Sequence, residues 1–80
     1  MIRVKVKLFA TLRRYYPELG IGGGLDVELP DGATVGQLVN HLGLPADHVR
    51  VVFINGIARD ESYTLSDGDE VGIFPPVGGG

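Results

Sequence analysis

Hydrophobic and polar residues alternate along the start of the chain, in the stretch IRVKVKLF. The apolar members of this alternation are Ile2, Val4, Val6 and Leu8, and the basic residues Arg3, Lys5 and Lys7 fall between them. A period of two predicts a β-strand with one buried and one solvated face. The stretch LDVEL, residues 25–29, repeats the alternation, and the PDG that follows it is a turn signal. Two half-buried strands are therefore expected in the first part of the chain.

A helical period follows in TVGQLVNHLG, residues 34–43. Its apolar positions are Val35, Leu38, Val39 and Leu42, which share one face of a helix. Thr34 and Gln37 have the spacing of a capping box, in which each side chain bonds to the other residue's backbone N–H. Gly43 and Pro45 are typical of a helix end. This segment predicts one amphipathic helix.

The second half of the chain is rich in β-branched residues. VRVVFI (49–54) predicts a strand, Asn55-Gly56 a tight hairpin turn, and IAR (57–59) a short return strand. A turn at Asp67-Gly68 precedes a last strand, Glu70 to Phe74, which Pro75 ends because proline has no N–H for a ladder bond. Earlier in the chain, residues 10–19 predict a short helix or turn, and the glycine-rich 20–24 a loop.

One amphipathic helix needs one sheet face to cover. The expected fold is therefore α+β, with a mixed sheet of about five strands covered on one face by the main helix and a short helix or turn. We expect residues 1–74 to form this domain and residues 75–80 to form a flexible tail.

The amino-acid composition argues against several classes of function. The 80 residues carry a formal net charge of −3, which argues against nucleic-acid binding, because that usually requires a basic domain. There is no cysteine, which excludes disulfides, zinc–thiolate sites and cysteine nucleophiles. No apolar run reaches the roughly 20 residues that a membrane span requires. A cytoplasmic protein without membrane contact is expected.

The last six residues, PPVGGG, have an unusual combination of properties. Pro75 and Pro76 favour a stiff extended conformation, and glycines 78–80 have no side chain, so the end of the chain can enter a narrow channel. At roughly 3.3 Å per extended residue the tail reaches about 20 Å, and it presents the α-carboxylate of Gly80. The alternative is an inert chain end, since termini are usually tolerant of change.

This tail belongs to a longer pattern. The order of strands, the Asn-Gly hairpin, LSDGDEVGIFPPV (65–77) and the terminal Gly-Gly resemble the ubiquitin-like sulfur carriers, which have the β-grasp fold. Within them the chain is most similar to the small subunit of molybdopterin synthase, the MoaD type. Carriers of the thiamin pathway, the ThiS type, share the Gly-Gly end but generally lack the Phe-Pro-Pro. Gly78 departs from the pattern, because an alanine is common at that position.

The resemblance implies a mechanism. An adenylating enzyme of the ubiquitin-activating type, using ATP and magnesium, would activate Gly80, and a sulfur donor would convert it to a thiocarboxylate for molybdopterin synthesis. The tail, from Pro75 and Pro76 through Val77, Gly78 and Gly79, would enter a channel in the large subunit of molybdopterin synthase. Catalytic side chains would belong to the partners, and this chain would hold no metal or permanent cofactor.

Phe74 is the residue that we expect to dock on a partner. If the last strand is regular, Phe74 points away from Val71 and Ile73 and is exposed, whereas an irregular strand end would place it in the core. Both readings remain open. The basic residues of the first strand either are a solvated face or match an acidic partner, and Arg13 and Arg14 can extend that surface.

Other polar residues have simpler interpretations. His41 and His48 are expected at the surface, and Asp67 and Asp69 are expected to serve turn geometry rather than calcium binding. Three further functions stay open: a carrier for thiamin or another sulfur pathway, a ubiquitin-like modifier joined through Gly80 to lysines, and a β-grasp RNA-binding module with an inert tail. The acidic balance weighs against the last of these.

Overall fold

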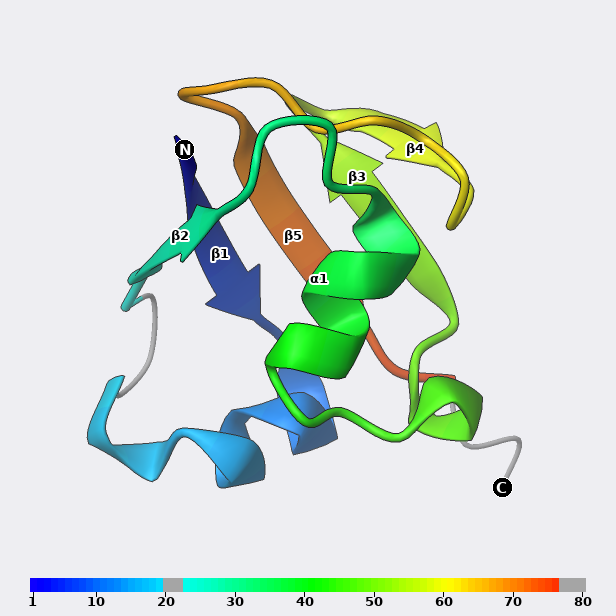
Figure 1. Ribbon diagram of the computed structural model, residues 1–80. Helices are drawn as coiled ribbons and strands as arrows, with labels where there is room; N and C mark the ends of the chain where they lie inside the picture. Colours follow the sequence, from blue (N-terminus) through cyan, green and yellow to red (C-terminus); the bar gives the residue numbers. More distant parts are fainter. Residues whose placement is uncertain (20–22, 77–80) are drawn as a thin grey trace.

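The computed structural model describes residues 1–19 and 23–76. Its strands form one mixed sheet in the order β2-β1-β5-β3-β4. Their bounds are Ile2–Leu8 for β1, Leu25–Leu29 for β2, Val51–Ile54 for β3, Ile57–Arg59 for β4 and Glu70–Phe74 for β5. Helix α1, Val35–His41, crosses one face of the sheet (Figure 1). The predicted β-grasp arrangement is confirmed.

Short 3-10 helices occupy the connections around this sheet. They are η1 at Ala10–Tyr15, η2 at Pro17–Leu19 and η3 at Ala46–His48. All three lie at the end of the sheet where β1 and β5 finish (Figure 1). In the part of the chain that the structure describes, no helix has the length and apolar character that a bilayer crossing requires.

The two central strands, β1 and β5, run parallel, in a register that extends from Lys5 opposite Glu70 to Leu8 opposite Ile73. Antiparallel β2 and β3 flank this pair. Backbone bonds continue the pairing beyond the strand, since the Phe9 N–H donates to the carbonyl oxygen of Ile73 at 3.1 Å. The first and last strands therefore finish side by side, in the middle of the sheet.

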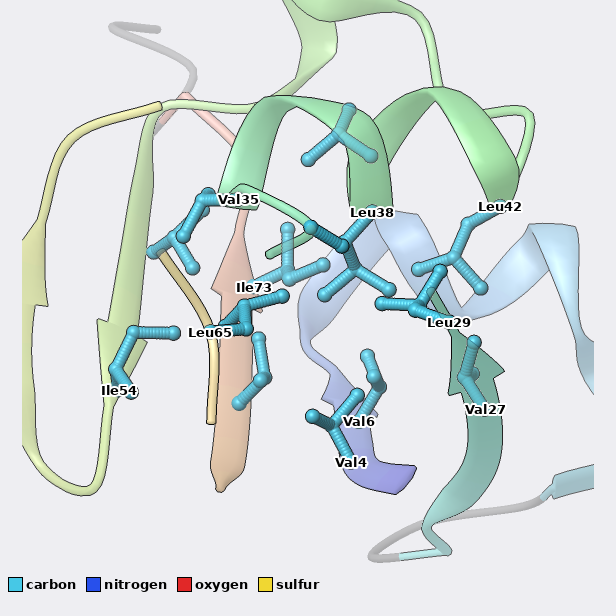
Figure 2. Packing of buried hydrophobic residues seen from close by; sticks show 14 of the residues in the cluster. Val4, Val6, Val27, Leu29, Val35, Leu38, Leu42, Ile54, Leu65 and Ile73 are labelled. Carbon is cyan, nitrogen blue, oxygen red and sulfur yellow. The ribbon is translucent and has the colours of Figure 1, made fainter. Parts of the chain in front are cut away.

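The core lies between α1 and the inner face of the sheet (Figure 2). Leu38 of α1 is completely buried, as are Val6 of β1 and Ile73 of β5. Strand β1 alternates strictly between buried and exposed residues, as its sequence predicts. Burial of apolar side chains is the main stabilising contribution in a domain of this size.

Both ends of α1 follow the sequence signals. The Thr34 hydroxyl accepts from the Gln37 backbone N–H at 3.2 Å, and the Gln37 side-chain oxygen accepts from the Thr34 N–H at 2.9 Å, which completes the capping box. Gly43 follows the helix with a φ of +74°, a conformation that glycine adopts without strain.

Two segments differ in detail from expectation. Strand β3 begins at Val51 rather than at residue 49, because the Val49 N–H donates to Ala46 and closes η3. At the other junction, Ala10 has a φ of +54° where β1 passes into η1. After this turn, Leu12 of η1 joins the hydrophobic core, where it is buried.

A buried carboxylate stabilises the far end of the sheet, where β5 begins. Asp69, 7% exposed, accepts from the Asn55 side-chain amide at 2.9 Å and from the Ser66 N–H at 2.8 Å. Asn55, with a φ of +52°, also accepts from the Glu70 N–H at 2.9 Å. Asp67 accepts from the Arg3 N–H at 2.8 Å. Both aspartates thus stabilise turns, and no group of three metal-ligating side chains occurs among the described residues.

We expect Asp69→Ala to lower the free energy of unfolding by about 1–3 kcal/mol, because the Asn55 amide and the Ser66 N–H lose their buried acceptor. Urea denaturation followed by circular dichroism measures this change. Asp47→Ala, at an exposed position in η3, is the matched control and should stay within about 0.5 kcal/mol of the wild type. Equal losses in the two variants would contradict the assignment.

Candidate docking face and tail base

Phe74, predicted to dock on a partner, is the last residue of β5 and lies on the sheet face opposite α1. It is half-buried, as is Pro75, while Pro76 is exposed. The other predicted tail residues, Val77, Gly78, Gly79 and Gly80, lie outside the described residues. The structure therefore defines the base of the tail.

The Phe74 ring belongs to an aromatic cluster. It stacks on the ring of Phe9, with centroids 4.2 Å apart and planes at 2°, and it meets the edge of Phe53, with centroids 5.5 Å apart at 81°. Such pairs stabilise each other by about 0.5–1.5 kcal/mol beyond the burial of area. Phe9, Phe53 and Phe74, named here the aromatic cluster, come from three segments that are remote in sequence.

The absence of a side chain at Gly72 leaves space for the rings of the aromatic cluster. A Cβ atom at this position would lie 3.2 Å from Phe9 Cε2 and 3.7 Å from Phe74 Cε1. The missing side chain therefore lets the Phe9 ring lie close to β5. Beside the rings is an open groove of about 400 Å³, whose lining includes Lys7, Asn55 and Glu70.

Each ring of the aromatic cluster is half-buried, and none belongs to the hydrophobic core. The structure thus places Phe74 on the open face, as the alternation indicates, with its ring partly covered by two others. The sequence interpretation missed Phe9 and Phe53. A signal for both was present, because Phe9 continues the exposed phase of Lys5 and Lys7, and Phe53 lies between buried Val52 and Ile54.

The basic residues of β1 line the same open face. All three are exposed, and the two nearest the start of the strand lie opposite acids of β2, Arg3 opposite Glu28 and Lys5 opposite Asp26. The Arg3 guanidinium lies 3.6 Å from the Glu28 carboxylate. Exposed pairs of this kind contribute little to stability. Lys7, at the other end of the strand, borders the aromatic cluster.

A cleft of about 310 Å³ lies where the tail begins, between η1 and η3. Its lining includes Thr11, Arg14, Pro75 and Pro76. The Tyr15 hydroxyl and His48 Nδ1 are 3.0 Å apart and form a hydrogen bond across it. His48 and His41 are both exposed, and His41 lies in the last turn of α1, where a cation interacts favourably with the helix dipole.

Comparison with known proteins identifies a family for this chain. The model of the ThiS family matches residues 6–80. The chain belongs to the ThiS family. No curated protein matches this ThiS-family chain significantly.

Solved structures agree on the fold. A Pyrococcus furiosus protein, provisionally named molybdopterin converting factor subunit 1, is 31% identical, with a TM-score of 0.72 over 96% of this chain and 100% of its own. Small archaeal modifier protein 1 of Haloferax volcanii is 28% identical, with a TM-score of 0.73 over 96% of this chain and 100% of its own.

A more distant likeness supports the fold alone. A structure of subunits 1 and 2 of the Helicobacter pylori molybdopterin-converting factor contains a chain that is 19% identical, with a TM-score of 0.64 over 99% of this chain and 100% of that one. The ThiS-family chain is therefore a small ubiquitin-like β-grasp protein, as the tail motif and the strand order predict.

We expect Gly72→Ala to lower stability by about 1 kcal/mol, because the added methyl meets the Phe9 ring, which the neighbouring Phe74 ring restrains. Gly24→Ala is a matched control, since its Cβ would lie 3.1 Å from the flexible side chain of Lys5. Denaturation curves measure the free energy of unfolding. NOEs between the rings of Phe9 and Phe74 report the stack, and we expect them to weaken in Gly72→Ala. Preserved ring contacts in Gly72→Ala would contradict this account.

Proposed function

We propose that this protein is a sulfur carrier that acts through the α-carboxylate of Gly80, as the small subunit of a molybdopterin synthase. One observation carries the proposal. In a chain of the ThiS family, a half-exposed aromatic cluster lies directly beside Pro75, where the glycine-ended tail begins. A partner that binds the cluster would therefore have the start of the tail, Pro75, at a fixed position on its own surface.

The chemistry uses the carboxylate and needs no side chain of this protein. An oxygen of the Gly80 carboxylate attacks the α-phosphorus of ATP, pyrophosphate leaves, and an acyl-adenylate remains. Magnesium, held by the activating enzyme, neutralises the phosphate charge. Hydrosulfide then adds to the carbonyl carbon, AMP leaves and the sulfur loses its proton, which produces the thiocarboxylate without a redox step. Because the sulfur is attached to the terminal carbonyl carbon, the absence of cysteine is no obstacle.

The aromatic cluster supplies the docking surface in this proposal. Large aromatic side chains that become desolvated at an interface often carry most of its binding energy. The activating enzyme and the large subunit each need Gly80 in their active sites. Both therefore approach from the tail end, and they bind this protein in turn rather than together.

A second candidate is a ubiquitin-like modifier. The similarity to a Haloferax volcanii protein named as a small archaeal modifier favours it. In that case a lysine amine of another protein attacks the activated Gly80 carbonyl and an isopeptide bond forms. A carrier for the thiamin pathway uses the same activated carboxylate and differs in the acceptor of sulfur.

Intact-mass spectrometry tests the main proposal. The protein is incubated with ATP, magnesium, a sulfide source and an adenylating enzyme of the ubiquitin-activating type. We expect a mass increase equal to the replacement of one oxygen by sulfur, and no increase in a variant that lacks Gly79 and Gly80, which no longer ends in Gly-Gly. An unchanged mass, with the enzyme shown to be active on another carrier, counts against the proposal. Bands of higher mass that survive reducing agent indicate the modifier.

Removing rings from the cluster should separate docking from folding. We expect Phe74→Ala and Phe53→Ala each to lower kcat/KM for thiocarboxylate formation by about 30-fold, the effect of losing roughly 2 kcal/mol at a binding hot spot. Each ring is half-buried, so the loss of stability should remain about 1–2 kcal/mol, less than for a core ring.

Ile57→Ala is the control for these variants. Ile57 of β4 is 55% exposed and does not line the groove beside the cluster, so its loss should change kcat/KM less than about twofold. Circular dichroism checks that all three variants are folded. Similar kcat/KM values for the three would argue that docking uses another face.

A further inference from the structure

Charge is distributed unevenly between the two ends of the molecule. The tail end comprises residues 7–18, 45–51 and 74–76, where β1 and β5 finish and η1 and η3 lie (Figure 1). Its side chains include four basic and two acidic residues, a formal charge of +2. The rest of the sequence has three basic and eight acidic side chains, a formal charge of −5, which together give the total of −3.

The basic residues of the tail end are Lys7, Arg13, Arg14 and Arg50, named here the basic collar. All four are exposed. The ion pairs of the described residues are those of Arg3 with Glu28 and of the Met1 amine with Asp31, so they include no member of the collar. Among the described residues, no side chain of the collar therefore stabilises the fold through an ion pair.

Three residues of the collar lie near the point where the tail leaves the sheet. The Arg50 N–H donates to the carbonyl oxygen of Phe74 at 2.8 Å, and Arg14 lines the cleft that contains Pro75 and Pro76. Lys7 lines the groove next to the aromatic cluster. Basic residues therefore adjoin the proposed docking face at the groove, which Glu70 also lines, and at the cleft beside the tail.

Hydrogen bonds to the backbone of η1 restrain the two arginines of this segment. Arg13 Nε donates to the Ala10 carbonyl oxygen at 3.4 Å, and Arg14 Nε donates to the Thr11 carbonyl oxygen at 3.3 Å. The Tyr15–His48 hydrogen bond joins η1 to η3, so the segments that carry Arg14 and Arg50 are tied together across the cleft. The acids of this end, Glu18 and Asp47, form no ion pair among the described residues.

We infer that the basic collar is an interaction surface for a protein partner that presents carboxylates around the entrance of its tail-binding channel. The inference rests on the proposed function, because it assigns this chemistry to the activating enzyme that receives Gly80. Charges at the rim of an interface accelerate association and orient the partners more than they increase final affinity. The opposite, acidic end of the molecule is repelled by the same partner surface, so the tail approaches the channel first.

The first experiment needs no enzyme. Amide NMR spectra of the labelled protein are recorded at low salt during addition of hexaglutamate, as a probe of carboxylate recognition. We expect shift changes concentrated in residues 10–15 and 45–50, and their loss in Arg13→Glu/Arg14→Glu. Shift changes centred on Arg3 or Arg59, or an unaltered response in the double variant, overturn the inference.

The second experiment uses the activating enzyme. We expect Arg14→Glu to lower kcat/KM for thiocarboxylate formation by about tenfold at low salt, and the deficit to shrink at high salt, where charges are screened over about 3 Å. Arg59→Glu, the same charge change on β4, should lower it less than about twofold. Equal effects of the two variants overturn the inference.

The two experiments also separate this inference from the proposed function. If hexaglutamate binds at the tail end but no adenylating enzyme acts on Gly80, the collar is supported as a carboxylate-binding surface and the sulfur-carrier proposal is wrong. A second outcome is that Gly80 is converted efficiently and Arg14→Glu has the same kcat/KM as Arg59→Glu at every salt concentration. The sulfur-carrier proposal is then supported, and the inference about the collar is wrong.

Discussion

The parallel pairing of β1 with β5 is the interaction on which the rest of the structure depends. It joins residues more than sixty positions apart and makes the first and last strands the centre of the sheet. The outer strands pair against this centre, and α1 covers its inner face. Because parallel strands run in one direction, both finish at the same end, which brings Phe9 beside Phe74 and makes the tail leave from the middle of the sheet.

The two faces of the sheet have separate roles. The inner face and α1 contain the completely buried side chains, where changes in volume are costly (Figure 2). The open face carries half-buried rings and exposed charges, on which stability depends less. This separation is compatible with the proposed carrier role, in which the protein binds more than one partner, since contact residues on the open face can change without disturbing the core. Gly72 illustrates the division, because its missing side chain serves the rings of the open face while Val71 and Ile73 on either side are buried.

The two ends of the sheet are also different. At the far end, the Asp69 carboxylate is nearly buried and each of its oxygens accepts an internal hydrogen bond, so it links the β3–β4 hairpin to the start of β5. At the tail end, the arginines are exposed and bond weakly to nearby carbonyls. A buried carboxylate is thus satisfied within the fold at one end, and exposed guanidinium groups are accessible to a partner at the other. In the proposed reaction the protein contributes a carboxylate and a surface, and the partners contribute catalysis.

The sequence by itself determined the features that depend on neighbours along the chain. The alternation from Ile2 to Leu8, the Thr34–Gln37 capping box and the Asn55-Gly56 turn were all predictable, because each is set by interactions within a few residues. The tertiary structure alone decided which remote residues meet. The stack of Phe9 on Phe74, the bond between Tyr15 and His48 and the positive φ of Ala10 have no local cause. They follow from the strand order and from the packing of η1 at the end of the sheet, which are fixed by contacts between distant parts of the chain.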